Sequence, residues 1–191
     1  MSKMTLYFAT GNASKVREIK AILQELPLTI VQVDAKGEEI QSDFLEEIAN
    51  ESAYRASNNR KLPLFVEDSG LFIDALRGFP GPYTSYVFKT IGLSGVLSLM
   101  QGVDRRRAVF CSVVSFCRPE GKPVSFVGEA MGRIAISARG NNGFGFDPIF
   151  EPEEGDGRTF AEMKMVEKNS VSHRTKAVCA FAKWYLELGI R

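Results

Sequence analysis

The first third of the chain alternates between short apolar runs and stretches with helical spacing. The apolar runs are residues 4–9, 28–33 and 64–66. Between them, apolar side chains recur every three or four residues, which is typical of an amphipathic helix. These side chains are Val16, Ile19, Leu23 and Leu26 before Pro27, and Phe44, Leu45, Ile48 and Ala53 in a stretch that extends toward Lys61. Strands alternating with helices predict a mostly parallel α/β sheet, with ligand sites where strands end in loops.

The pattern changes after Gly70. Glycines and prolines at positions 78–82 predict a loop, and the run through Tyr86, Val87 and Phe88 predicts irregular β structure. A short helix is expected between Leu93 and Met100.

Two long strands are expected next, at residues 108–117 and 124–136, joined by a turn at 119–122. Consecutive strands of this kind imply an antiparallel part of the sheet. Residues 175–188 close the chain as an amphipathic helix. No repeat or low-complexity linker divides the sequence, so it is expected to form one domain over residues 1–191, with two lobes as a compatible variant.

Composition and charge narrow the partners. The 191 residues are 45% hydrophobic, enough for a substantial core. Lysine and arginine number 24 against 23 acidic residues, so the net charge of +1 favours small ligands over nucleic acid. The run Arg105 to Arg107 is interpreted as a solvated turn, with a contact to phosphate or nucleic acid as the alternative.

The cysteines and the apolar segments bear on the compartment. Cys111, Cys117 and Cys179 have no metal-ligand spacing, and their odd number favours buried thiols in a reducing compartment. No segment reaches the ~20 apolar residues of a membrane span. A cytoplasmic protein with no membrane partner is expected.

The loop Thr10-Gly11-Asn12-Ala13-Ser14-Lys15 is a candidate anion site. It lies between the first expected strand and the first expected helix, where backbone N–H groups and the helix dipole favour a phosphate. Lys15 adds a cation. The second glycine and the Gly-Lys-Ser/Thr ending of the Walker pattern are missing, so kinase-type or motor-type ATP chemistry is not indicated.

Carboxylates follow the third apolar run. Glu67-Asp68-Ser69-Gly70 places two carboxylates and a hydroxyl at the expected end of a strand, where they suit Mg²⁺. An Asp-Ser-Gly turn that caps backbone amides is an equally good interpretation. Glu38 and Glu39 follow the second apolar run and could converge on the same sheet edge. If Glu39 meets Asp68, one can hold the metal while the other deprotonates water.

Two further segments could contact a ligand. Residues 141–148, Asn-Asn-Gly-Phe-Gly-Phe-Asp-Pro, combine glycines with Phe144, Phe146 and Asp147. Either an exposed Phe stacks on a base and the carboxylate accepts a ring N–H, or the loop buries both rings in the core. His173 is the only histidine and lies among basic residues, which argues against a metal ligand.

Six motifs in order along the chain resemble the inosine triphosphate pyrophosphatase family. They are Thr-Gly-Asn-x-x-Lys at 10–15, Glu-Asp-Ser-Gly-Leu at 67–71, Gly-Phe-Pro-Gly at 78–81, Gly-Phe-Gly-Phe-Asp-Pro at 143–148, Phe-Ala-Glu-Met at 160–163, and Lys-Asn with Ser-His-Arg at 168–174. Each motif is short, but six in register from end to end make coincidence a poor explanation. The sequence departs from the family at Phe146, where Tyr or Trp is usual.

The resemblance implies an enzyme that cleaves ITP, dITP or XTP between the α and β phosphates, with Mg²⁺ as cofactor and a homodimeric assembly. It implies an α/β fold with a central mixed, elongated sheet flanked by helices, and an active-site cleft between two lobes. Asp68 would be the proton acceptor, and Glu39 and Asp68 the metal-linked carboxylates. The implied substrate-binding residues are Thr10, Gly11, Asn12, Ala13, Ser14, Lys15, Ser69, Phe144, Gly145, Phe146, Asp147, Lys168, His173 and Arg174.

The resemblance also assigns parts of the substrate. Residues 10–15 would hold the triphosphate, Phe144 would stack on the purine, and Asp147 would meet its Watson–Crick edge. Lys168, His173 and Arg174 would read the 6-oxo group, because a donor-rich pocket rejects the 6-amino group of adenine. The alternatives are a pyrophosphatase for another modified nucleotide and a nucleotide-sensing module without turnover.

Overall fold

The computed structural model describes residues 3–34 and 40–188 and divides the chain into two compact units. Unit 1 comprises residues 1–68, 112–128 and 174–191, and unit 2 comprises residues 69–111 and 129–173. Over the described residues, none of the helices has the length and apolar character needed to cross a membrane.

The described residues form a seven-stranded sheet in the order β2-β1-β3-β5-β6-β7, with β4 paired to β3. Its strands are β1 (Met4–Ala9), β2 (Leu28–Val33), β3 (Leu64–Ile73), β4 (Pro80–Gly81), β5 (Arg107–Cys117), β6 (Val124–Ile134) and β7 (Phe150–Pro152). The pairs β1/β2 and β1/β3 are parallel, whereas β3/β4 and β6/β7 are antiparallel. The expected mixed α/β sheet is therefore confirmed.

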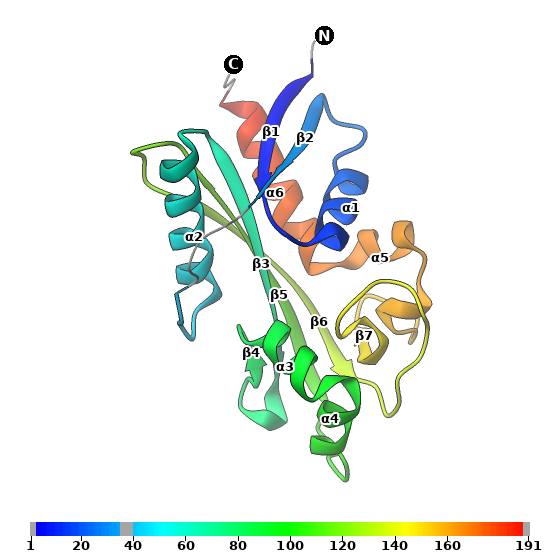
Figure 1. Cartoon of the computed structure of the whole chain (residues 1–191). Helices are drawn as coiled ribbons and strands as arrows, with labels where there is room; N and C mark the ends of the chain where they lie inside the picture. Colours follow the sequence, from blue (N-terminus) through cyan, green and yellow to red (C-terminus); the bar gives the residue numbers. More distant parts are fainter. Residues whose placement is uncertain (1–2, 35–39, 189–191) are drawn as a thin grey trace. The chain divides into compact units, whose positions relative to one another are not determined.

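Unit 1 builds its core between β1 and two helices. Figure 1 shows α1 (Ala13–Ile22) and α6 (His173–Glu187) beside β1. Phe8 of β1 stacks on Phe65 of β3 with 4.6 Å between the ring centres. The ring of Phe65 also packs on that of Phe181 of α6, with 5.0 Å between their centres. All three rings are fully buried.

The helix α2 (Leu45–Arg60) covers the other face of the sheet in unit 1. On β5, Phe116 points to the core shared with α6, whereas the preceding Ser115 donates a hydrogen bond to Asn50 of α2 at 2.7 Å. Because successive strand residues point to opposite faces, α2 and α6 lie on opposite faces of β5.

Unit 2 contains the short helices α3 (Thr84–Thr90), α4 (Gly92–Leu99) and α5 (Met165–Val171). The β structure expected at Tyr86 to Phe88 is wrong, because these residues form the middle of α3. Val87 is 4% exposed in the unit 2 core, while Tyr86 is 68% exposed. In the helix Val87 is buried while its neighbours Tyr86 and Phe88 stay more exposed. The packing of Val87 in the core therefore outweighs the preference of these residues for β structure.

The Glu67–Gly70 motif lies inside a strand and not in a turn. The strand expected at residues 64–66 continues to Ile73, so the interpretation as an Asp-Ser-Gly turn is wrong. Gly70 is needed for close packing, since a Cβ there would lie 2.6 Å from the carbonyl oxygen of Gly81 on the paired strand β4.

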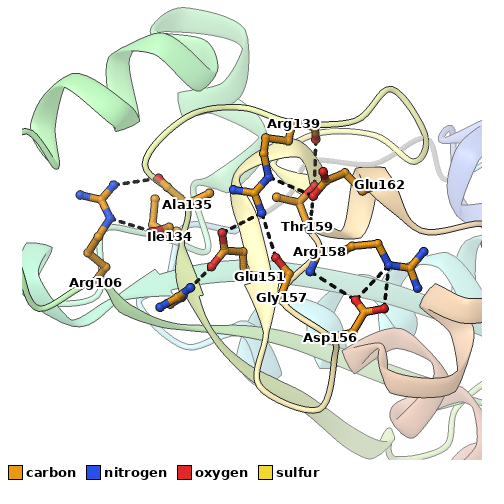
Figure 2. A network of polar contacts seen from close by, with 11 residues as sticks. Arg106, Ile134, Ala135, Arg139, Glu151, Asp156, Gly157, Arg158, Thr159 and Glu162 are labelled. Atoms are coloured by element: carbon orange, nitrogen blue, oxygen red, sulfur yellow. Dashed lines mark hydrogen bonds and ion pairs between the residues drawn. The ribbon is translucent and has the colours of Figure 1, made fainter.

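The basic run Arg105 to Arg107 is also not simply a solvated turn. The Arg106 guanidinium donates to the carbonyl oxygens of Ile134 and Ala135 at 2.7 and 2.8 Å, as Figure 2 shows. It also donates to the carbonyl oxygen of Met100 at 2.7 Å. Arg106 therefore holds the segment after α4 against the end of β6.

Candidate active site

The loop between β1 and α1 is built around the side chain of Asn12. Its Oδ1 accepts the backbone N–H groups of Ser14 at 2.9 Å and Lys15 at 3.2 Å, which makes Asn12 the N-cap of α1. Thr10 Oγ1 accepts the N–H of Asn12 at 3.1 Å. The strand, loop and helix expected here are confirmed, but two of the first-turn amides already bind Asn12.

Lys15 points from α1 to the carboxylates of β3. Its Nζ donates to the carbonyl oxygen of Glu67 at 2.6 Å and lies 3.0 Å from Glu67 Oε2 and 3.7 Å from Asp68 Oδ1. A cation at a helix start opposes the helix dipole, and these two carboxylates offset that cost. Unit 1 thus brings together two residues expected from the sequence, Lys15 and Asp68.

Glu67 is the centre of a buried group of charges. Its side chain is fully buried, and Oε1 accepts the hydroxyl of Ser112 at 2.6 Å. Arg174 Nε lies 3.2 Å from Oε1, and the same guanidinium pairs with Glu18 Oε2 at 2.5 Å. Burial acts to lower the pKa of Arg174, but the charges of Glu67 and Glu18 outweigh it and raise that pKa.

Asp68 differs from its neighbour in accessibility. Its side chain is 26% exposed, whereas that of Glu67 is fully buried. An accessible carboxylate next to a lysine can accept a proton from water or bind a divalent cation. The neighbouring residue Ser69 is half-buried.

The oxygen donors present suit Mg²⁺, which binds through one or two carboxylates and keeps several water ligands. Asp68 supplies such a donor. Glu39, the second expected ligand, lies outside the described residues, as does Glu38. Within residues 3–34 and 40–188, no three His, Cys, Asp or Glu side chains gather in a way that could hold a metal by themselves.

Unit 2 holds a second buried charge pair. Lys168 Nζ on α5 donates to Asp147 Oδ2 at 2.6 Å, and both side chains are at most 4% exposed. The same oxygen accepts the N–H of Phe144 at 2.8 Å, and Lys168 Nζ lies 5.3 Å from the centre of the Phe144 ring. Three residues expected to contact the base are therefore adjacent.

The glycines of residues 141–148 permit this arrangement. Gly143 has φ of +72°, and a Cβ there would lie 2.0 Å from Asp147 Oδ2. Gly145 has φ of +62°. Both backbone conformations favour glycine. At Gly143 the absence of a side chain also leaves room for the Asp147 carboxylate.

The other expected base-contacting residues are in the cores. Phe146 is 1% exposed and packs edge-on against Phe88 at 5.4 Å, so this ring lies in the core as the alternative interpretation of the loop allowed. His173 is 2% exposed and stacks on Phe110 of unit 2 at 4.6 Å. The next residue, Arg174, belongs to unit 1 and contacts Glu18 and Glu67 there. His173 and Arg174 are therefore adjacent in sequence but belong to different units.

Sequence reasoning considered Glu67 only as one of two carboxylates that suit Mg²⁺, and it did not select Glu18 or Ser112. Glu18 lies three residues after Lys15 and so shares its face of α1, which was an available signal. Ser112 is one of two serines in the mostly apolar strand β5, and nothing in the sequence distinguishes it from Ser115. Its pairing with Glu67 depends on sheet order, which the sequence pattern did not specify.

Comparisons with known proteins agree with this geometry. A family model described as Ham1 family matches residues 6–184. A dITP/XTP pyrophosphatase of Methanopyrus kandleri is 53% identical over 95% of this chain and 96% of its own length. The protein of the same name from Pyrococcus horikoshii is 47% identical over 95% and 96% of the two chains.

Solved structures agree as well. A HAM1 protein from Coxiella burnetii has a TM-score of 0.83 at 30% identity and covers 96% of this chain and 99% of its own. The Ham1 protein of Staphylococcus aureus has a TM-score of 0.81 at 28% identity and covers 97% and 100%. The resemblance carried by the six motifs is confirmed, and the chain belongs to the Ham1 family.

Proposed function

We propose that this chain is a pyrophosphatase that cleaves non-canonical purine nucleoside triphosphates, namely ITP, dITP and XTP, into the monophosphate and pyrophosphate. The observation that carries the proposal is the cluster of Lys15, Glu67 and Asp68 beside the loop that precedes α1. The names of the relatives, dITP/XTP pyrophosphatases at 42–53% identity, support the same activity and substrate class.

The unit 1 cluster would handle the triphosphate. Residues 10–15 would bind it, and Lys15 would neutralise phosphate charge. Ser69, the residue after Asp68 in β3, would also contact the substrate. Glu67 fixes Lys15 through two contacts, one from its carbonyl and one from its carboxylate. Asp68, the more accessible carboxylate, would take the proton from the attacking water. The water oxygen would then attack the α phosphorus, and pyrophosphate would leave.

Magnesium would be held by Asp68 and Glu39. When bound, Mg²⁺ neutralises phosphate charge and lowers the pKa of a coordinated water. The support for this cofactor is the oxygen donor set, because Asp68 is accessible and is adjacent to a lysine that contacts both carboxylates.

The unit 2 cluster, which consists of Phe144, Asp147 and Lys168, would recognise the base. Phe144 would stack on the purine, Asp147 would accept from its Watson–Crick edge, and Lys168 would donate to the 6-oxo group. The buried ion pair between Asp147 and Lys168 holds both polar groups in place. Gly145 keeps the loop in its conformation, and Phe146 supports the loop from the core.

For His173 and Arg174, the proposed role follows their surroundings. The stacking of His173 on Phe110 fixes the orientation of its ring in unit 2, and the ring would donate to the 6-oxo group. Arg174 would contribute by balancing the charges of Glu18 and Glu67 and thereby orienting the Lys15 cluster.

We further propose that residues 1–191 act as one catalytic domain, as a cytoplasmic homodimer. The odd number of cysteines, with no metal-ligand spacing between them, supports a reducing compartment. Tyr83, Tyr86 and Phe88 on and beside α3 are each at least 39% exposed, and neighbouring exposed aromatics support a protein interface. Size-exclusion chromatography with light scattering tests the assembly.

Product analysis tests the function directly. The purified chain with Mg²⁺ should release pyrophosphate and IMP from ITP, and do so much faster than it releases AMP from ATP. Equal rates on the two nucleotides, or orthophosphate as the first product, contradict the proposal. A panel of methylated and pyrimidine triphosphates separates it from a pyrophosphatase for another modified nucleotide.

A matched pair of variants tests the role of Asp68. Asp68→Asn should lower kcat for ITP by about 10²- to 10⁴-fold while nucleotide binding stays measurable, because the variant lacks a proton acceptor. Asp74→Asn is the control, since Asp74 is a partly exposed aspartate that pairs with Arg105 in unit 2. A nucleotide sensor would bind ITP without turnover in the unmodified chain.

A further inference from the structure

The loop that carries Phe144 and Asp147 is closed at its base by Arg139. The backbone N–H of Arg139 donates to the carbonyl oxygen of Pro148 at 2.9 Å. Residues 140–147 between these two points are named the base loop here. Because Arg139 lies at the first position outside the base loop, its contacts fix where the loop begins.

The guanidinium of Arg139 holds three groups that lie after the loop in sequence. It donates to Glu162 Oε2 at 3.1 Å and to the carbonyl oxygen of Gly157 at 2.9 Å, and it pairs with Glu151 Oε1 at 2.8 Å (Figure 2). The carbonyl oxygen of Arg139 also accepts the hydroxyl of Thr159 at 2.8 Å. One arginine thus connects the start of the base loop to β7 and to the segment that follows it.

That segment leads directly to the helix that carries Lys168. The 3-10 helix η3 (Phe160–Glu162) follows Thr159, and α5 begins three residues after η3 ends. Glu162 Oε2 accepts the N–H of Thr159 at 2.8 Å, and Glu167 Oε2 accepts the N–H of Lys164 at 2.7 Å. The two glutamates cap the N-termini of η3 and α5, and only two residues separate the helices, so the position of η3 restricts where α5 can begin.

The base loop touches the same segment at a second point. Asn142 donates from its backbone to the carbonyl oxygen of Ala161 at 2.9 Å and from its side chain to that of Met163 at 3.0 Å. A Cβ at Gly140 would lie 2.2 Å from the Ala161 carbonyl group. The loop therefore packs tightly on η3, and Arg139 holds the start of this contact.

We propose that Arg139 is a positioning residue for base selection, which holds the base loop against η3 and so sets the spacing between Phe144, Asp147 and Lys168. The inference rests on the proposed function, because it concerns how the base of that substrate is chosen. Lys168 contacts both Asp147 at 2.6 Å and the Phe144 ring at 5.3 Å, so a shift between loop and α5 changes both contacts.

Arginine suits this position better than lysine. A planar guanidinium can bind Glu151, Glu162 and a carbonyl oxygen together, whereas one ammonium group has no fixed fork and a different reach. Arg139→Lys therefore keeps the charge and loses the set of contacts. Arg133→Lys is the matched control, because Arg133 on β6 pairs with the same Glu151 but has no part in the base loop.

The test compares ITP and ATP in the unmodified chain, Arg139→Lys and Arg133→Lys. In Arg139→Lys we expect KM for ITP to rise about tenfold, kcat to stay within about twofold, and the ITP preference over ATP to fall about tenfold. Arg133→Lys should keep the preference. Inhibition by inorganic triphosphate should be the same in all three, because it depends on the unit 1 cluster.

The outcomes separate the two proposals. If the unmodified chain does not hydrolyse ITP, the proposed function fails. If it does, and Arg139→Lys keeps the KM and the ITP preference, the positioning role is overturned while the function stands. A merely structural role for Arg139 would lower the amount of active protein, and so reduce kcat for both nucleotides without changing KM or their ratio. Equilibrium binding of IMP, expected to weaken about tenfold in Arg139→Lys alone, gives a readout independent of turnover.

Discussion

At the residue scale, Asp147 and Lys168 show what the buried charges of this chain depend on. Both side chains are almost inaccessible, and each offsets the desolvation cost of the other. We expect Lys168→Met to lower the free energy of unfolding by about 3–5 kcal/mol, because the Asp147 carboxylate stays buried without its cation. Urea-induced unfolding measures the loss.

The double variant Asp147→Asn with Lys168→Met provides the control. It removes both charges, so we expect it to be more stable than Lys168→Met alone. The single variant Asp147→Asn completes the comparison. If the stability lost in the double variant equals the sum of the losses in the two single variants, the two side chains do not stabilise each other.

Glycine packing gives a second prediction at this scale. Gly70→Ala should lower the free energy of unfolding by about 1–3 kcal/mol, since the new Cβ would meet the backbone of Gly81, which cannot move without breaking the β3/β4 pair. Gly11→Ala is the control, because a Cβ at Gly11 meets no atom within 4 Å. Equal effects of the two substitutions in thermal unfolding would contradict this account of Gly70.

At the scale of elements, α1 depends on a single cap. Asn12 binds two first-turn amides, so Asn12→Ala should cost about 1 kcal/mol of stability. Asn12→Asp keeps an acceptor at this position and should lose much less. Chemical denaturation distinguishes them, and a loss of the same size in both variants would show that the cap is not the cause.

The segment from Asp156 to Glu167 should be sensitive to acid. A hydrogen bond from the Thr159 backbone, and then Arg139, lowers the pKa of Glu162, while Arg158 lowers the pKa of Asp156 and Glu167. Folded pKa values below the ordinary ones, about 4 for these carboxyls, mean that ionisation favours the folded state. This contribution is complete above about pH 4.3 and disappears as the pH falls through the lowered values.

Thermal unfolding between pH 6 and pH 2 checks this. Glu162→Gln should be less stable than the unmodified chain at pH 6, and the difference should shrink as the pH falls, because the protonated glutamate no longer binds Arg139 as an anion. A difference that stays constant over this range would show that the ionisation of Glu162 does not contribute to stability.

Elements with a clear period were predictable from the sequence. The strands β1, β2 and β5 and the helix α2 lie where the spacing of apolar residues placed them. The β interpretation of Tyr86 to Phe88 failed because three residues carry no period, and burial of Val87 decided the outcome. The extension of β3 to Ile73 was missed because its glycine signalled a turn, whereas it is the close approach of Gly81 that requires Gly70.

The candidate site was predictable to the extent that its motifs are local. The loop at residues 10–15 was expected from its pattern, and base contact by Phe144 and Asp147 was one of two interpretations of their loop. The role of Lys168 beside them was expected only through the family resemblance. The partners of Glu67 come from β5, α1 and α6, which are distant in sequence. Such a convergence depends on sheet order and on helix docking, which single-sequence periodicity does not determine.

At the scale of the whole molecule, the two units contribute different chemistry. Unit 1 supplies an accessible carboxylate, Asp68, beside Lys15, and these groups suit a metal and phosphates. Unit 2 supplies Phe144 with the Asp147–Lys168 pair, which suits a flat polar ring. Metal dependence should therefore belong to turnover and not to recognition of the base.

Chelation tests this division. Removal of Mg²⁺ with EDTA should abolish pyrophosphate release from ITP, and added Mg²⁺ should restore it, because Asp68 and Glu39 are the proposed ligands. Binding of IMP, measured by calorimetry, should change by less than about threefold on chelation, since Asp147 is already paired with Lys168 and is not one of the proposed metal ligands. Loss of IMP binding together with turnover would show that the base-contacting groups also depend on the metal.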